Sequence, residues 1–334
     1  MYFFVLKRLL LLVPSMVGLL VLSFFMVTTL PADPAVALAG ENATPEQVQK
    51  VREEFGFDKP FHVQAITYLR HVAHGEFGVS NYTRRPVVTD LLDRIPATLE
   101  LAVVSILISV VFGIPLGVWA AVEHNRWPDH LMRLLTVAGF GIASFWLALM
   151  LQLTFAMDLR LLPLTGRLAE GLRPPPTVTG FLLVDSVLAG NWPVLWSALQ
   201  HLALPAITLS VAGITTIARF TRAGMLEVLQ HEYINYARAA GYPERRIVWL
   251  YALRPAITPA VTQIGLLFGA VIAGSVVVET IFVWPGIGTY VAEAILAVDY
   301  KPMLAITLLI GVIYALVNVA VEIVVAIIDP RMRE

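Results

Sequence analysis

Cysteine is absent from this chain, which excludes disulfide bonds and thiolate metal sites. Lysine is scarce: there are four, and none is followed by serine or threonine, so the Gly-Lys-Ser/Thr ending of a phosphate-binding P-loop is missing. The seven histidines are scattered, and no His-Glu-x-x-His pair of zinc ligands occurs. We therefore expect no cofactor, no catalytic site and no ATP hydrolysis by the chain itself.

Charged residues are also few, at 14% of the 334 residues, whereas 58% are hydrophobic and the mean hydropathy is +0.76. This composition excludes an ordinary soluble globular protein. A helix needs about 20 apolar residues to cross the hydrocarbon core of a bilayer. We expect an all-α integral membrane protein with six transmembrane helices. The six segments are Leu9–Leu30, Leu101–Val122, Leu134–Met157, a span within Trp196–Ala218, Ala256–Val278 and Pro302–Val321, the last continuing to Ile328.

Arginine and lysine collect on one side of these segments, which predicts that both termini are cytoplasmic. The short loops on the other side hold only Arg160, Arg167, Arg173 and Lys301. The cytoplasmic side then carries Lys7, Arg8, Arg126, Arg133, Arg219, Arg222, Arg238, Arg245, Arg246, Arg254, Arg331 and Arg333.

The first span has an alternative interpretation as a cleavable signal peptide, because Lys7-Arg8 precedes it and Ala37-Leu38-Ala39 follows it. The apolar core of a signal peptide runs to only about 7–15 residues. Leu9–Leu30 is longer than that, so we expect an uncleaved helix.

Residues 31–95 are expected to form a small subdomain on the outer face, inserted after the first helix, residues 1–30. Thr44-Pro45-Glu46-Gln47 predicts a helix start there. His71 and His74 are spaced like metal ligands, but no third ligand is near, and solvated histidines are the favoured interpretation. Residues 96–328 would form a membrane core of five helices, and residues 329–334 a cytoplasmic tail.

A polar, helix-forming segment from Glu232 to Ala240 lies between two apolar spans on the predicted cytoplasmic side. Gly241 stands where a left-handed cap would end this helix. Tyr233, Tyr236 and Ala237 share one face at helical spacing. A helix this short needs a partner surface. From these residues alone, that surface is either a soluble protein or the lipid headgroups, with Arg245-Arg246 as anchors.

Several motifs together resemble the permeases of binding-protein-dependent ABC importers, in the branch that transports dipeptides and oligopeptides and also nickel or glutathione. The loops Pro163–Arg167 and Thr179–Asp185 are most similar to those of dipeptide permeases. The other motifs are Tyr233–Gly241 with Ala252–Pro259, Gly75–Ser80, Arg94–Leu101, Glu279–Gly288 and Asp329-Pro330-Arg331.

The resemblance implies a type I importer fold in a bacterial inner membrane. It also implies four kinds of partner: a similar second permease chain, two ABC ATPase subunits, an external substrate-binding protein and the lipid bilayer. Relatives often have Lys where Ala240 stands and Leu where Tyr242 stands. By the same resemblance, the residues that couple to the ATPase are Glu232, Tyr233, Tyr236, Ala237, Arg238, Ala239, Ala240, Gly241 and Arg245.

Two pairs of glycines, each four residues apart, predict close helix packing within the membrane. They are Gly113 with Gly117, and Gly265 with Gly269. An alternative is that these faces slide or hinge during transport. Polar residues within the spans are few, which argues against proton-driven transport. They are Gln152, His201, Gln263, Asn318 and Glu322.

The function expected is therefore that of a permease subunit, without enzyme activity of its own, in an ATP-driven importer of dipeptides or oligopeptides. The same architecture importing nickel or glutathione is the alternative within the family. A secondary transporter would need ion-coupling residues near the midplane and a repeated half, and neither is visible in the sequence. An intramembrane enzyme would need a nucleophile with a base, or metal ligands, within the spans, and none is found.

Overall fold

The computed structural model describes residues 14–15, 17–23, 25, 34–39, 43–54 and 58–328. Most of the first predicted span, Leu9–Leu30, lies outside these residues, as does the tail 329–334. Within them, all regular structure is helical except for one isolated antiparallel bridge between Val79 and Pro86. The all-α prediction is confirmed.

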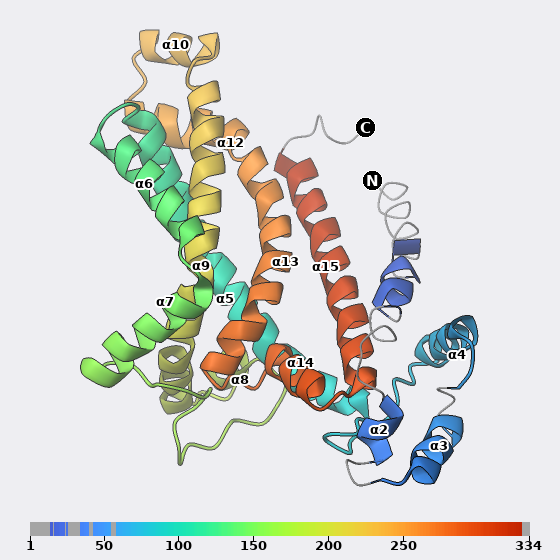
Figure 1. The fold of residues 1–334 in the computed structure, drawn as a ribbon. Helices are drawn as coiled ribbons and strands as arrows, with labels where there is room; N and C mark the ends of the chain where they lie inside the picture. The colour runs from blue at the N-terminus through green and yellow to red at the C-terminus, as the bar shows by residue number, and fades with distance from the viewer. Residues whose placement is uncertain are drawn as a thin grey trace.

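Four long helices form the body of the molecule and are apolar enough to cross a membrane. The four are α5 (Val87–Val122), α9 (Trp192–Val228), α13 (Thr258–Ile281) and α15 (Tyr300–Ile328). In Figure 1, α13 lies between α9 and α15, and α5 crosses behind them. The most extensive helix contact is between α5 and α9.

Two of these helices extend beyond the predicted spans, because polar turns at their ends are buried against neighbouring elements. Helix α5 begins at Val87 rather than Leu101 and runs through Pro96, so the expected domain boundary at residues 95 and 96 falls inside it. Helix α9 runs on past Ala218 to Val228. It begins after Asn191, whose side chain accepts a hydrogen bond from the amide of Val194.

The predicted span Leu134–Met157 falls on a bent pair of helices. Helix α6 (Trp127–Gly141) is followed by α7 (Ser144–Leu151) and a π-helical turn, η1 (Gln152–Asp158), at an angle of 99°. Ile142 and Ala143 are extended at the break. Glycine weakens the helix just before it: Gly139 packs on Thr215 of α9 with no room for a side chain, and Gly141 follows. If this pair is one span, up to five spans lie in the described part of the chain.

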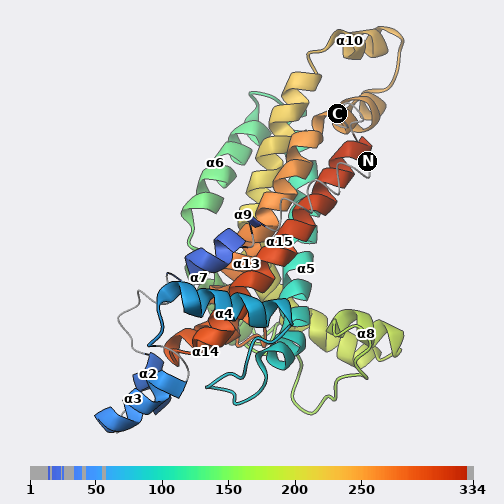
Figure 2. The ribbon, with the colours of Figure 1, turned by 90° about the vertical axis from the view of Figure 1, so that its right-hand side faces the viewer.

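The short helices gather at the two ends of the long ones (Figures 1 and 2). We call these the α10 end and the α14 end. The α10 end holds α10 (Glu232–Ala239), α11 (Glu244–Arg246), the π-helical η2 (Ile247–Ala252) and α12 (Leu253–Ala256). The α14 end holds α8 (Leu182–Leu188) and α14 (Ile287–Leu296), so the loop before α9 is less irregular than its prolines indicate.

The N-terminal region contributes α2 (Pro34–Ala39), α3 (Pro45–Glu54) and α4 (Phe61–Ala73). The helix start predicted at Thr44 is confirmed. The amide of Thr44 donates to the Gln47 side chain at 2.9 Å, and the amide of Gln47 donates back to the Thr44 hydroxyl at 3.4 Å.

Candidate functional site

Helix α10 ends in a Schellman motif built on Gly241. This glycine has a φ of +81°, in the left-handed region that costs other residues free energy. The amide of Gly241 donates to the carbonyl of Arg238 at 3.0 Å, and the amide of Tyr242 donates to that of Ala237 at 3.2 Å. These bonds satisfy carbonyl groups at the helix end and turn the chain back toward α11.

The face of α10 that packs inward is marked by Ile234 and not by the tyrosines. Ile234 is fully buried, and Ala237 packs beside it. By contrast Tyr233 is 44% exposed and Tyr236 is 73% exposed. The aliphatic side chain can be buried without desolvating a hydroxyl group, which favours Ile234 as the anchor. The tyrosines therefore remain available on the outer surface of the helix.

Ile234 inserts into a cluster made by the ends of the long helices. The other buried members of this cluster are Val118, Ala121, Met225, Val228, Ile247, Val248, Ala252 and Ala256. These residues belong to α5, α9, η2 and α12, so one buried cluster joins α10 to the ends of the long helices, and the most extensive contact of α10 is with η2. The structure thus connects the exposed helix mechanically to the membrane-spanning body.

The remaining predicted coupling residues fall into two groups. Glu232, Arg238, Ala239, Ala240 and Gly241 are exposed on α10 or its cap. Arg245 instead lies on α11, a separate element. The only ion pair that α10 makes within the described residues joins Arg238 Nε to Glu244 Oε1 at 2.8 Å. That these residues contact an ATPase stays a prediction.

A buried carboxylate that sequence reasoning missed fixes the turn between α5 and α6 to α9. Asp129 is fully buried and accepts a hydrogen bond from Arg222 NH2 at 2.9 Å. It also accepts one from Arg133 NH2 at 2.8 Å and one from the amide of Asn125 at 3.1 Å. The i, i+4 spacing of Asp129 and Arg133 was visible in the sequence; the decisive partner, Arg222, is remote and was not.

The first glycine pair lies where α5 meets α9. A Cβ placed on Gly113 would come within 2.9 Å of the Cβ of Ile217. One on Gly117 would come within 2.5 Å of the carbonyl oxygen of Ala218. Both distances are shorter than real Cβ atoms allow, so this interface admits glycine alone.

The second glycine pair lies where α13 meets α15. A Cβ on Gly265 would come within 2.7 Å of the side-chain oxygen of Asn318, and one on Gly269 within 2.7 Å of the Tyr314 ring. The two pairs therefore sit in different interfaces, α5 with α9 and α13 with α15. What these interfaces do during transport stays a prediction.

At the α14 end, a buried network ties α5, α13 and α14 together. Glu279 of α13 is fully buried and accepts hydrogen bonds from the Thr98 hydroxyl at 2.7 Å and from the amide of Thr289 at 3.1 Å. The same Thr98 hydroxyl accepts a hydrogen bond from the amide of Ile287 at 2.8 Å. The first amides of α14 are thus satisfied by side chains from two spanning helices.

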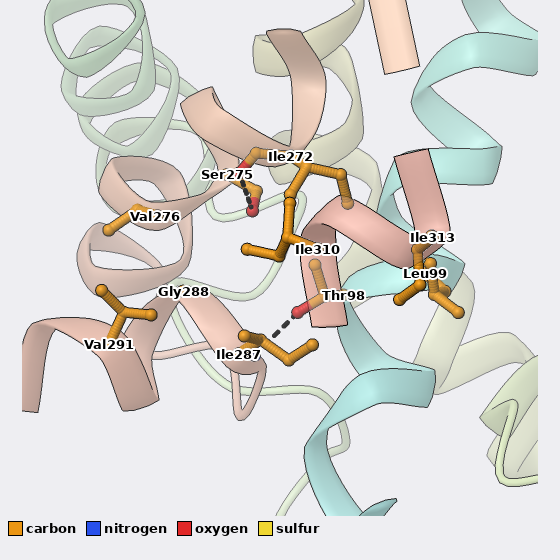
Figure 3. Close-up of a pocket in the computed structure, with 10 residues that line it drawn as sticks. All are labelled: Thr98, Leu99, Ile272, Ser275, Val276, Ile287, Gly288, Val291, Ile310 and Ile313. Atoms are coloured by element: carbon orange, nitrogen blue, oxygen red, sulfur yellow. Dashed lines mark hydrogen bonds between the residues drawn. The ribbon is translucent and has the colours of Figure 1, made fainter. Parts of the chain in front are cut away.

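A small cavity of about 20 Å³ lies beside this network, with room for about one water molecule. Figure 3 shows Thr98 pointing toward Ile287, with Ile272 and Ser275 above them and Ile310 and Ile313 alongside. The residues that line the cavity are apolar apart from Thr98 and Ser275. The cavity is too small for a peptide.

The loop before α8 is attached to the same end. Gln152 Nε2 donates to the carbonyls of Leu164 at 3.0 Å and Ile281 at 3.3 Å. The Glu100 carboxylate pairs with Arg167 and accepts the amide of Leu183 at 2.7 Å. Gln152, which was singled out as an intramembrane polar residue, is therefore a structural tie.

Residues 78–86 are clamped onto α5 and α14 by two further buried acids. Asp299 accepts hydrogen bonds from the Ser80 hydroxyl at 2.7 Å and the amide of Asn81 at 2.6 Å. Asp90 accepts one from the Tyr290 hydroxyl at 3.1 Å. Burial, together with the negative charges of Asp90 and Asp299, raises the pKa of Tyr290 to about 12, although a hydrogen bond with Ser80 works the other way.

Three other polar residues singled out in the sequence contact nearby backbone or a neighbouring helix. His201 Nδ1 lies 2.7 Å from the carbonyl oxygen of Ser197 on its own helix, and Asn318 packs against Gly265. His74 Nδ1 lies 2.7 Å from the carbonyl oxygen of Arg70, also on its own helix. Within the described residues, no group of three or more His, Cys, Asp or Glu side chains could hold a metal ion.

Two protein-family models together match nearly the whole chain. Residues 113–334 match the family described as binding-protein-dependent transport system inner membrane component. Residues 1–102 match the corresponding N-terminal family of such membrane components.

Individual relatives align along almost their full length. The probable D,D-dipeptide transport system permease protein of Escherichia coli is 42% identical over 315 residues, which cover 94% of this chain and 93% of the relative. The dipeptide transport system permease protein of the same species is 37% identical over 333 residues, or 99% and 98% of the two chains. The glutathione transport system permease protein of Salmonella typhimurium is 38% identical over 330 residues, again 99% and 98%.

Proposed function

Because this chain belongs to the family of binding-protein-dependent transport system inner membrane components, we propose that it is one of two permease subunits of an ATP-driven peptide importer. A similar second permease chain would complete the path across the membrane. Two ATPase subunits would hydrolyse ATP, and an external binding protein would deliver the substrate. The family membership and the full-length relatives support this assignment.

The observation that carries the mechanism is the position of α10. The helix lies beyond the ends of the long helices (Figures 1 and 2), offers two exposed tyrosines, and is anchored inside by Ile234. We propose that an ATPase subunit holds its outer surface. ATP-driven closure of the ATPases would then displace α10 and, through the cluster around Ile234, the ends of α5 and α9.

The proposed orientation places the α10 end and both termini in the cytoplasm, with the α14 end outside. The basic residues Arg222, Arg245 and Arg246 lie at the α10 end, which agrees with the positive-inside rule. In this orientation α2 to α4 belong to an outer-face insertion after the first transmembrane helix. The α14 end, with its clamped loop 78–86, would face the binding protein.

The proposed substrates are dipeptides or oligopeptides, because two of the relatives above are named as dipeptide or D,D-dipeptide permeases. Glutathione, itself a short peptide, is the second candidate because a relative of similar identity is named for it. Uptake of a labelled dipeptide by cells that express the complete transporter, with unlabelled glutathione as competitor, separates the two.

Purification of the tagged chain from its native membrane in mild detergent tests the assembly. We expect mass spectrometry to identify P-loop ATPases and a second permease. A chain recovered alone, or only with copies of itself, in several detergents would contradict the proposal and favour a secondary transporter.

The absence of cysteine allows a sharper test with single introduced cysteines. Tyr236→Cys on α10 should crosslink to an ATPase subunit. Leu107→Cys should not, because Leu107 is also exposed but lies in the middle of α5. For orientation, Asn235→Cys should be labelled by a membrane-impermeant reagent only from the inside, and Glu76→Cys from the outside. The reverse labelling pattern would overturn the orientation and the ATPase contact with it.

A further inference from the structure

The segment that follows α10 presents an unusual mixed surface to its surroundings. We call it the Arg-Trp face; it consists of Arg245, Arg246, Trp249, Leu250 and Arg254, all exposed. Trp249 is 47% exposed and Leu250 is 54% exposed, although both lie in a helical segment whose other side is buried. Large apolar side chains and arginines therefore share one face at spacings of three to five residues.

The opposite side of the segment prevents this face from turning inward. Ile247 and Ala252 are completely buried in the same cluster as Ile234, and Val248 and Ala256 lie beside them. Rotating the segment to cover Trp249 would expose these four side chains. The outward direction of the Arg-Trp face is thus set by the core.

The positive charge of this face is not neutralised by the protein. The one acid in the segment, Glu244, is already paired with Arg238 of α10 at 2.8 Å. The guanidinium of Arg246 lies 5.3 Å from the centre of the Tyr242 ring, which orients it without reducing its charge. Among the described residues, no acid lies within ion-pair distance of Arg245, Arg246 or Arg254.

The face also lies at the level where a bilayer would end. It stands between the end of α9 at Val228 and the start of the spanning helix α13 at Thr258, and α10 lies beyond it (Figure 1). Tryptophan and arginine are favoured at this level, since the indole ring sits among the headgroups and arginine pairs with lipid phosphate. A water-facing surface would explain the arginines but not the exposed Trp249 and Leu250.

We propose that the Arg-Trp face is a binding site for anionic phospholipids, with the arginines on the headgroups and Trp249 and Leu250 at the boundary of the acyl chains. This separates two neighbouring surfaces: α10 for a soluble partner, and residues 245–254 for lipid. The inference rests on the proposed membrane orientation but not on the docking of an ATPase. In this proposal Arg245 binds lipid and does not contact the ATPase.

Fluorescence quenching by brominated lipids tests the site in the complete purified protein, with whatever subunits co-purify, reconstituted into nanodiscs. The contribution of Trp249 is the difference between the natural chain and Trp249→Phe, because the chain has six other tryptophans. Brominated phosphatidylglycerol, diluted in phosphatidylcholine, should quench Trp249 more strongly than the same fraction of brominated phosphatidylcholine. Arg245 and Arg246 should each enrich the anionic lipid around Trp249 roughly fivefold, and this enrichment should be smaller at high salt.

Arg245→Gln with Arg246→Gln should remove most of the preference for phosphatidylglycerol, because only Arg254 remains, while leaving quenching by phosphatidylcholine. Arg126→Gln is the matched control, since Arg126 is exposed at the same end but pairs with Glu123 away from this face. Quenching of the other tryptophans reports correct insertion of each variant. Equal quenching by the two lipids, or none by either, would overturn the proposal; the second result would mean that protein or water covers the face. Neither result depends on ATP or transport, so the importer assignment is tested separately.

Discussion

The two connections between spanning helices are held in opposite ways. At the α14 end, Glu279 and Thr98 make directional hydrogen bonds to the amides that begin α14, and both side chains are buried. At the α10 end, α10 is anchored by one buried aliphatic side chain, Ile234. The ion pair between Arg238 of α10 and Glu244 is exposed.

This difference has a mechanical consequence. Buried hydrogen bonds fix angle as well as distance, so α14 cannot shift without leaving polar groups unpaired. Apolar contact is not directional, so α10 can tilt while Ile234 stays buried. The α14 end is built as a fixed joint, and the α10 end as a movable attachment suited to a partner that changes shape.

The largest effect on stability is expected for Glu279→Ala. It removes the acceptor for Thr98 and for the amide of Thr289 and leaves them buried, at a cost of about 3 kcal/mol in the free energy of unfolding. Thermal unfolding in detergent, followed by size-exclusion chromatography, measures the loss. Glu279→Gln keeps an acceptor of the same shape and should retain much of the stability. Equal stability of the alanine variant and the natural chain would disprove the fixed joint.

A smaller loss, about 2 kcal/mol, is expected for Gly288→Ala at the same end. Its Cβ would lie 2.6 Å from the Cα of Val276 and 2.8 Å from Glu279, so α14 would be pushed away from α13. Gly274→Ala on α13 is the control, because its nearest neighbour would be Leu209 at an ordinary 3.6 Å. The same thermal assay should separate the two variants, and similar midpoints for both would count against the tight packing.

Ile234→Ala should weaken the packing of α10 by about 2 kcal/mol, because the shorter side chain leaves a cavity. The unfolding of the spanning helices should change little. ATP hydrolysis by the assembled transporter should continue while uptake falls, because α10 no longer transmits its movement. Tyr236→Ala, at a residue 73% exposed, should instead weaken association with the ATPase and leave stability unchanged. Coupled uptake that survives in Ile234→Ala would argue against the anchor.

A smaller loss of stability, about 1 kcal/mol, is expected for Gly241→Val, since an added Cβ would meet no atom within 4 Å and only backbone strain acts. The φ of +81° nevertheless strongly disfavours a β-branched residue, so the end of α10 should shift and uptake should be lost with insertion intact. Gly241→Asn, which tolerates the left-handed region, should keep most of the uptake. Normal uptake by the valine variant would refute the capped helix as a coupling element.

Local signals in the sequence predicted local features well. Apolar runs predicted the spans within α5, α9, α13 and α15, and Gly241 marked the end of α10. These features depend on neighbours within a few residues, which a sequence displays directly. The same reasoning did not predict the break at Ile142, which follows the close approach of Gly139 to Thr215 of α9, a contact between remote segments.

The buried carboxylates show more clearly which features cannot be predicted from the sequence. Glu279 and Asp129 stand near the ends of apolar helices, where an acid is ordinarily expected to face water. Their partners Thr98 and Arg222 lie 181 and 93 residues away in the chain. Nothing local distinguishes such a residue from a solvated one, so only the assembled helices reveal it.

By itself, the sequence determined that the chain is a helical membrane protein, that its polar helix at Glu232–Ala239 ends at a left-handed glycine, and which family it resembles. Those properties follow from hydrophobicity, backbone sterics and motif order. The tertiary structure alone decided that Ile234 rather than the tyrosines faces inward, that α6 and α7 bend apart, and that the two ends are held by different forces. Each of those depends on burial and on remote partners, which exist only once the helices have packed.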